Sequence, residues 1–121
     1  MVKQLDEMVA DLLSQFNDHN KCFPKNVIVF RDGVSEGQFY KVIETEIPLI
    51  KKAFKSTIGK SINLTVIVVQ KRHHTRFALA HQNANGRKPT YNVPSGTIVD
   101  KAIVDPQLKV FYLNSHFSPL V

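Results

Sequence analysis

The sequence predicts an α/β fold in which helices lie against a mixed β-sheet. Two observations support this prediction. The continuous apolar run Val27–Phe30 predicts a short strand, and the run Leu64–Val69 has the length and the Val and Ile content of a fully buried strand. The segment between them has apolar residues at helical spacing, so strand, helix and strand form a βαβ unit with parallel strands and a right-handed crossover. A chain of 121 residues is long enough for one such domain and too short for two.

Two amphipathic helices are predicted. The first covers residues 3–17, and its apolar side chains are Leu5, Met8, Val9, Leu12, Leu13 and Phe16. The second starts at Ser35, which forms an S-x-x-Q capping box with Gln38. Its apolar face consists of Phe39, Val42, Ile43, Ile47, Ile50 and Phe54. Pro48 lies inside this pattern and is expected to kink the helix or end its first half, because proline lacks the N–H group that the helix needs.

Shorter strands follow the βαβ unit. Arg76–Ala80 is predicted to be a strand that runs antiparallel or at an angle to the preceding one. His81–Thr90 is predicted to be a polar loop, since it is rich in Asn and Gly. Val93–Val99 contains a Pro-Ser-Gly turn and a short strand, and Lys109–Asn114 is a last apolar strand. These strands are expected to complete the mixed sheet.

Charge and cysteine content indicate the kind of partner and the cellular compartment that suit this protein. The formal net charge of +6 favours a polyanionic partner. The single cysteine, Cys22, excludes an intramolecular disulfide and a cysteine-rich zinc site, and it fits a reducing compartment. No apolar run is long enough to span a membrane, and the first residues do not resemble a secretory signal. We therefore expect a cytoplasmic or nuclear protein with no membrane partner.

The segment Lys71–Arg76 carries the strongest functional signal. It places Lys71, Arg72 and Arg76 directly after an apolar strand. Residues 47–99 contain nine Lys and Arg side chains and no Asp or Glu. Cations without local partner anions require external ones, and the phosphates of a nucleic acid are the best candidates. The alternative is an ordinary solvated basic face.

Asp32 is the candidate metal ligand. It follows the first strand on a Gly turn, and open α/β sheets bind ligands at the carboxyl ends of their strands. The alternative is a turn aspartate that accepts hydrogen bonds from nearby backbone N–H groups. A two-metal site needs several carboxylates, and the acids within the helices, Glu46 among them, are interpreted as solvated. His73 and His74 are adjacent and therefore a poor metal pair, and His116 taken alone is interpreted as a polar residue at a strand end.

Four motifs follow one another in an order and at a spacing typical of one family. They are V-F-R-D-G-V-S-E-G-Q-F at residues 29–39, I-V-V-Q-K-R-H-H-T-R at 67–76, V-P-S-G-T-I-V-D at 93–100 and F-Y-L-N-S-H at 111–116. Through these motifs the chain resembles the Piwi domain of eukaryotic Argonaute proteins. Residues 1–116 are accordingly predicted to be a partial Piwi domain, and residues 117–121 a divergent tail.

The resemblance implies an RNase H-like fold, here expected to be incomplete at both ends. It also implies a guide RNA bound along a basic channel, with Arg72, Arg76 and His116 at positions that contact the guide backbone. Lys71 belongs to the same basic motif. Asp32 falls on one of the family's four catalytic residues, which use Mg²⁺ or Mn²⁺ in members that cleave the paired target. The other three positions fall outside this chain, so its metal site is expected to be incomplete, with no cofactor bound by the chain alone.

The predicted function is therefore binding of small guide RNA in RNA-mediated gene silencing, without cleavage by this chain. The expected partner is a single-stranded small RNA or a guide–target duplex. One alternative is a small metal-dependent RNase H-like endonuclease, which would need carboxylates besides Asp32; Asp100 and Asp105 lie on suitable loops. The other alternative is a decoy or non-functional fragment, in which the basic face has no ligand.

Overall fold

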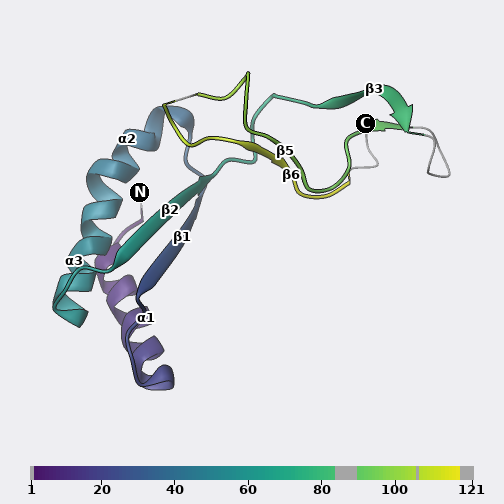
Figure 1. Cartoon of the computed structure of the whole chain (residues 1–121). Coiled ribbons are helices and arrows are strands. Elements are labelled where there is room, and N and C mark those ends of the chain that lie inside the picture. Colours follow the sequence, from purple (N-terminus) through teal and green to yellow (C-terminus); the bar gives the residue numbers. More distant parts are fainter. Residues whose placement is uncertain (1, 84–89, 106, 118–121) are drawn as a thin grey trace. The chain divides into compact units, whose positions relative to one another are not determined.

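The computed structural model describes residues 2–83, 90–105 and 107–117 (Figure 1). Its helices and strands are α1 (Leu5–Asn20), β1 (Asn26–Asp32), α2 (Phe39–Lys41), α3 (Ile47–Ile58), β2 (Asn63–Val69), β3 (Ala78–Asn83), β4 (Thr90–Asn92), β5 (Thr97–Val99) and β6 (Tyr112–Asn114). A 3₁₀ turn at Glu36–Gln38 precedes α2, and a π-helical turn at Val42–Glu46 joins α2 to α3. The chain divides into two compact units, residues 1–73 and residues 74–121.

The first unit contains the predicted βαβ arrangement. β1 and β2 pair in parallel, from Asn26 opposite Asn63 to Asp32 opposite Val69, which confirms the predicted strand direction. Figure 1 shows α1 and α3 beside this strand pair. Side chains from both helices and both strands form the core, in which Leu13, Ile50 and Phe54 are buried and Val9, Val27, Val29, Ile58 and Leu64 pack against them. Burial of this apolar surface is the main source of stability for the unit.

The described residues cover one face of the strand pair more fully than the other. Val27 and Val29 are half-buried against the helices, whereas Ile28 and Phe30 are 59% and 71% exposed. Val69 on β2 is exposed as well. The expectation of a fully buried strand at Leu64–Val69 is therefore wrong, because the described side chains of β2 are half-buried or exposed. A continuous apolar run does not say what covers each face, because successive side chains point to opposite sides of a strand.

The second helical segment begins directly after Ser35, as predicted, but its geometry changes along its length. The first turn is 3₁₀, and the Gln38 N–H donates to the Ser35 carbonyl at 2.9 Å. The π-helical turn then ends where Pro48 enters the first turn of α3. Pro48 has no N–H to donate to a carbonyl four residues earlier. The residue before it, Ile47, donates its N–H to the Val42 carbonyl five residues back, which is the hydrogen bond of a π-helical turn. The expected disturbance at Pro48 is thus a widened turn.

The second unit consists of two antiparallel strand pairs. β3 pairs with β4, with Ala78 opposite Asn92, and β5 pairs with β6, with Ile98 opposite Leu113. The predicted Pro-Ser-Gly turn precedes β5: Gly96 has a φ of +85°, a conformation that favours glycine, and the Thr97 N–H donates to the Pro94 carbonyl at 3.2 Å.

Several boundaries differ from the sequence-based predictions. The strand predicted at Arg76–Ala80 is observed at Ala78–Asn83, so it extends into the predicted loop, of which residues 84–89 lie outside the described part. The last strand is shorter than Lys109–Asn114. In the described residues the strands form three two-stranded sheets and not one mixed sheet. Strand ends depend on which neighbour supplies the hydrogen bonds, and local composition does not specify that neighbour.

Candidate functional site

The carboxyl ends of β1 and β2 bring two predicted site residues together. Because the strands are parallel and Asp32 lies opposite Val69, the chain leaving β2 passes the end of β1. Lys71 then reaches back, with its Nζ 2.7 Å from Asp32 Oδ2. The expectation that the basic segment lacks partner anions within the chain is therefore wrong for Lys71. It is also wrong for Lys52 on α3, whose Nζ lies 2.8 Å from Asp6 Oδ2 on α1. Both anions precede the acid-free part of the sequence, so a local count of charges does not find them.

Asp32 combines the two interpretations that the sequence left open. Its Oδ1 accepts a hydrogen bond from the Gly33 N–H at 2.7 Å, which is the behaviour of a turn aspartate. Gly33 has a φ of +76°, so glycine suits this turn. The Asp32 side chain is 54% exposed, and its other oxygen, Oδ2, contacts the Lys71 ammonium. The ammonium of Lys71, and then the Gly33 N–H, hold the pKa of Asp32 below its ordinary value, so the carboxylate is ionised and accessible.

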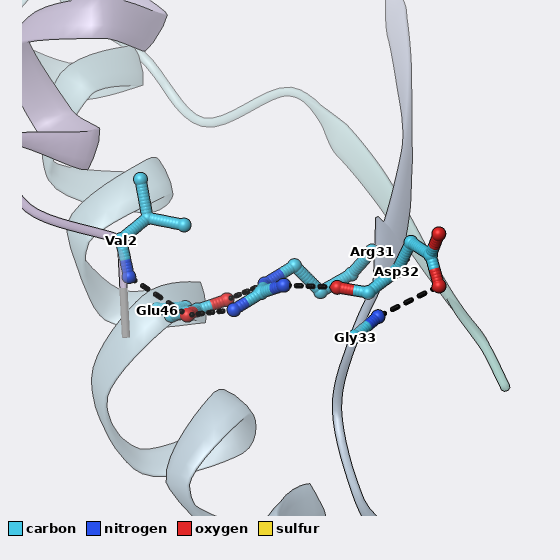
Figure 2. A network of polar contacts seen from close by, with 5 residues as sticks. All are labelled: Val2, Arg31, Asp32, Gly33 and Glu46. Carbon is cyan, nitrogen blue, oxygen red and sulfur yellow. Dashed lines mark hydrogen bonds and ion pairs between the residues drawn. The ribbon is translucent and has the colours of Figure 1, made fainter. Parts of the chain in front are cut away.

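Arg31 supports the same strand end from the opposite face of β1. Its side chain points toward the helices, where Nε lies 2.8 Å from Glu46 Oε2 and Nη2 lies 3.1 Å from Glu46 Oε1 (Figure 2). Arg31 Nη1 also donates to the main-chain carbonyl of Asp32. The Val2 N–H completes the network by donating to Glu46 Oε1 at 3.4 Å. These contacts tie β1, the π-helical turn and the start of the chain to one another.

Glu46 is a functional candidate that the sequence reasoning missed. The sequence pattern predicts a solvated helix residue at this position, but Glu46 is only 2% exposed. The paired guanidinium of Arg31 holds the pKa of Glu46 below its ordinary value of 4.5. Two signals in the sequence point to this pair. Arg31 continues the inward alternation of Val27 and Val29, and Glu46 lies four residues after Val42 on the buried face of the helical segment.

The carboxylates that the structure describes do not by themselves fit a two-metal centre. In the described residues, no group of three or more His, Cys, Asp or Glu side chains lies close enough together to hold a metal ion. Asp105, one of the acids considered for such a site, accepts the Gln107 N–H at 2.8 Å and so caps a local turn in the second unit. Asp32 can supply one hard oxygen ligand for Mg²⁺ or Mn²⁺, and the remaining ligands would have to come from other residues.

The other predicted RNA contacts divide between the two units. Arg72 belongs to the first unit and is exposed, whereas Arg76 and His116 belong to the second and are also exposed. Within the second unit, the Thr75 hydroxyl lies 3.2 Å from the Tyr112 hydroxyl, and the Phe77 ring packs edge-on against Tyr112 at 5.3 Å. The backbone of Arg76 is thus held beside β6, the strand that leads to His116.

His116 has a hydrogen-bond partner next to it in the chain. Its Nδ1 lies 3.0 Å from Ser115 Oγ, just after β6 ends. This contact leaves the other ring nitrogen, Nε2, as the atom directed away from the Ser115 hydroxyl. The geometry is compatible with a contact to a backbone phosphate, because a histidine N–H can donate to a phosphate oxygen.

Comparison with known proteins agrees with the motifs. The model of the Piwi domain family matches residues 1–119. Protein argonaute 18 of Oryza sativa subsp. japonica is 47% identical over 116 residues, 95% of this chain. Protein argonaute 7 of the same plant is 43% identical over 97% of the chain, and protein argonaute 7 of Arabidopsis thaliana is 41% identical over 96%. The chain therefore belongs to the Piwi domain family, and the resemblance inferred from its motifs is confirmed.

The relatives are much longer than this chain. The 121 residues span 11% of the length of each of these argonaute proteins. The α/β character of the first unit and its parallel strand pair are consistent with a part of a Piwi domain. No helix in the described ranges has both the length and the apolar content needed to cross a membrane.

Proposed function

We propose that this chain forms part of an RNA-binding surface in an Argonaute-type protein that acts in small-RNA-guided gene silencing. The observation that carries the proposal is the cluster at the carboxyl ends of β1 and β2, where Lys71 and Arg72 leave the sheet beside Asp32. Ligands of open α/β sheets bind at this edge, and the cations suit a phosphate backbone. An RNase H-like fold for the complete domain is part of the same proposal.

Each site residue has a role in this proposal. Lys71, Arg72, Arg76 and His116 hold backbone phosphates of a single-stranded guide or a guide–target duplex. Contacts of this kind fix the position of the strand and carry no sequence information, so specificity comes from base pairing between guide and target. Asp32 supplies one oxygen ligand to a divalent metal site that other residues complete. Cleavage by this chain alone is not expected, because a single carboxylate cannot hold two metal ions.

A salt titration of RNA binding tests the role of the arginines. Each phosphate neutralised by the protein contributes roughly 0.7 units to the slope of log affinity against log salt for a single strand. The double variant Arg72→Ala/Arg76→Ala should therefore flatten the slope by about 1 to 2 units and weaken binding about equally for RNAs of different sequence. The measurement is fluorescence anisotropy with a labelled single-stranded RNA at several salt concentrations.

The matched control removes the same number of charges from α3. Lys51 and Lys55 are exposed there, and neither takes part in the Lys52–Asp6 ion pair. The double variant Lys51→Ala/Lys55→Ala should change the slope less than the arginine variant does. An equal or larger loss in the lysine variant would mean that the charge acts as a diffuse field, and the proposed RNA path would be wrong. An absence of RNA binding by the wild-type chain would favour the decoy alternative.

A cleavage assay separates the proposal from the endonuclease alternative. A guide-paired RNA incubated with the wild-type chain and Mg²⁺ or Mn²⁺ should stay intact in a single-turnover experiment, and Asp32→Ala should give the same background. Clear cleavage by the wild type that disappears in Asp32→Ala would instead establish a metal-dependent nuclease.

A further inference from the structure

Glu46 is a buried charged side chain that the proposed RNA contacts do not use. It lies at the end of the π-helical turn and is 2% exposed. Burying a carboxylate is costly unless it is paired and hydrogen-bonded, so its presence calls for a reason. Both of its oxygens are satisfied: Oε2 by Arg31 Nε, and Oε1 by Arg31 Nη2 and the Val2 N–H.

The partner of Glu46 is the residue immediately before Asp32. Neighbouring side chains on a strand point to opposite faces, so Arg31 points toward the helices and Asp32 points away from them. The guanidinium nevertheless remains close to Asp32, because its Nη1 donates to the Asp32 main-chain carbonyl (Figure 2). Arg31 therefore contacts both Glu46 and the main chain of Asp32.

The electrostatics give this arrangement a second effect. Besides Glu46, Asp32 carries a negative charge that acts on the Arg31 guanidinium, so without Glu46 a charge-assisted pair between Arg31 and the Asp32 carboxylate would be favourable. With Glu46 present, the guanidinium stays on the helix side of β1. The Asp32 carboxylate is then bound by two other groups: the Gly33 N–H, whose nitrogen lies 2.7 Å from Oδ1, and the Lys71 ammonium, whose Nζ lies 2.7 Å from Oδ2.

We propose that Glu46 is a positioning residue for Asp32. It anchors Arg31, which fixes the main chain of Asp32 at the end of β1 and stays away from the Asp32 carboxylate. This positioning matters for function if Asp32 is a metal ligand, so the inference rests in that respect on the proposed function. The geometry itself concerns the orientation of one carboxylate and can be tested without RNA or metal.

The amide of Gly33 reports this orientation directly, because its N–H donates to Asp32 Oδ1. In ¹H–¹⁵N spectra of the full chain, Asp32→Ala defines the position of the Gly33 resonance when the bond is absent. We expect Glu46→Gln, which keeps the shape and removes the charge, to move the Gly33 resonance toward that position. Glu46→Asp, which keeps the charge, should move it less.

The matched control is Asp6→Asn. It weakens another ion pair of the first unit, the one that joins Lys52 on α3 to Asp6 on α1. Asp6→Asn should leave the Gly33 resonance in place. The proposal is overturned if Glu46→Gln gives a folded spectrum with an unchanged Gly33 resonance, or if Asp6→Asn moves that resonance as far as Glu46→Gln does.

A second variant covers the case in which Glu46→Gln does not fold. The double variant Arg31→Met/Glu46→Leu replaces the pair by apolar side chains and leaves no unpaired buried charge. It also removes the donor to the Asp32 carbonyl, so the Gly33 resonance should again move, and an unchanged resonance would contradict the proposal. These outcomes do not depend on RNA: if the wild-type chain binds no RNA and the Gly33 resonance still responds to Glu46, the proposed function fails and the positioning role stands.

Discussion

The two units of this chain hold their candidate site residues in different ways. In the first unit, Asp32 and Lys71 lie at the end of a parallel strand pair that packs on a core of helix side chains. In the second, Arg76 and His116 are held by short antiparallel pairs and by contacts of Thr75 and Phe77 with Tyr112.

Burial separates the units further. Every buried residue in the described part of the chain belongs to residues 1–73, including Leu13, Ile50, Phe54 and the paired Glu46. The strands of both units expose apolar side chains, such as Phe30 in the first and Leu113 in the second, so the difference lies in the buried residues. The first unit has a core of buried side chains on which the strand end that carries Asp32 can be held in place. The described strands of the second unit form two-stranded pairs without a comparable core, and such pairs are marginally stable in water.

The largest expected effect tests whether the first unit depends on its core. Phe54 is 1% exposed, and Phe54→Ala should lower the free energy of unfolding of the first unit by about 3–5 kcal/mol, through lost burial and the cavity left behind. Phe111→Ala is the counterpart in the second unit, where the ring is 53% exposed, and it should cost less than about 1 kcal/mol. Chemical denaturation measures both changes, and equal losses would contradict the contrast between the units.

The buried ion pair should give the next largest effect. Glu46→Ala leaves Arg31 without its partner and should destabilise the first unit by roughly 3 kcal/mol. The pair also predicts a dependence on pH. Arg31 lowers the pKa of Glu46 in the folded chain, so its stabilisation is present above the ordinary pKa of 4.5 and is lost as the pH falls through the lower folded value.

Denaturation at several pH values tests this prediction. Wild type should lose stability between about pH 5 and the acid range, whereas Glu46→Gln should lose less over the same interval because it has no carboxyl to protonate at that position. Asp6→Asn serves as the control. The pKa of Asp6 is also below its ordinary value, because Asp6 pairs with Lys52, but this pair lies at the surface. If wild type and Glu46→Gln lose the same stability on acidification, the pair does not contribute in the way proposed.

The smallest expected effect concerns the exposed pair at the site. Lys71 contacts Asp32 at 2.7 Å, and a phosphate must compete with that carboxylate for the ammonium. Asp32→Asn should therefore strengthen RNA binding about twofold to fivefold at low salt, and the gain should fade as salt screens the charges. Asp6→Asn makes the same change of charge beside Lys52, and anisotropy should show a smaller gain. A weaker binding of RNA by Asp32→Asn would mean that Asp32 helps to orient Lys71.

Local patterns in the sequence were sufficient for much of the first unit. The apolar runs and helical spacing predict the βαβ unit and its parallel strands, and Pro48 predicts a disturbance where the π-helical turn occurs. The motif around Arg31-Asp32-Gly33 and the basic motif at residues 67–76 identify the Piwi family, which the comparisons confirm. These inferences succeed because helix periodicity, proline chemistry and motif identity are properties of residues near one another in the chain.

Only the tertiary structure decided which distant residues meet. The Lys71–Asp32 contact joins residues from the ends of two strands, and its register follows from the pairing of β1 with β2. The burial of Glu46 depends on a strand residue, Arg31, that neutralises it from 15 positions earlier in the sequence. A charge taken alone is best solvated, and the partner that makes burial tolerable is supplied by folding. The sequence by itself therefore determined the family and the chemical types at the site, while packing determined how those charges are paired.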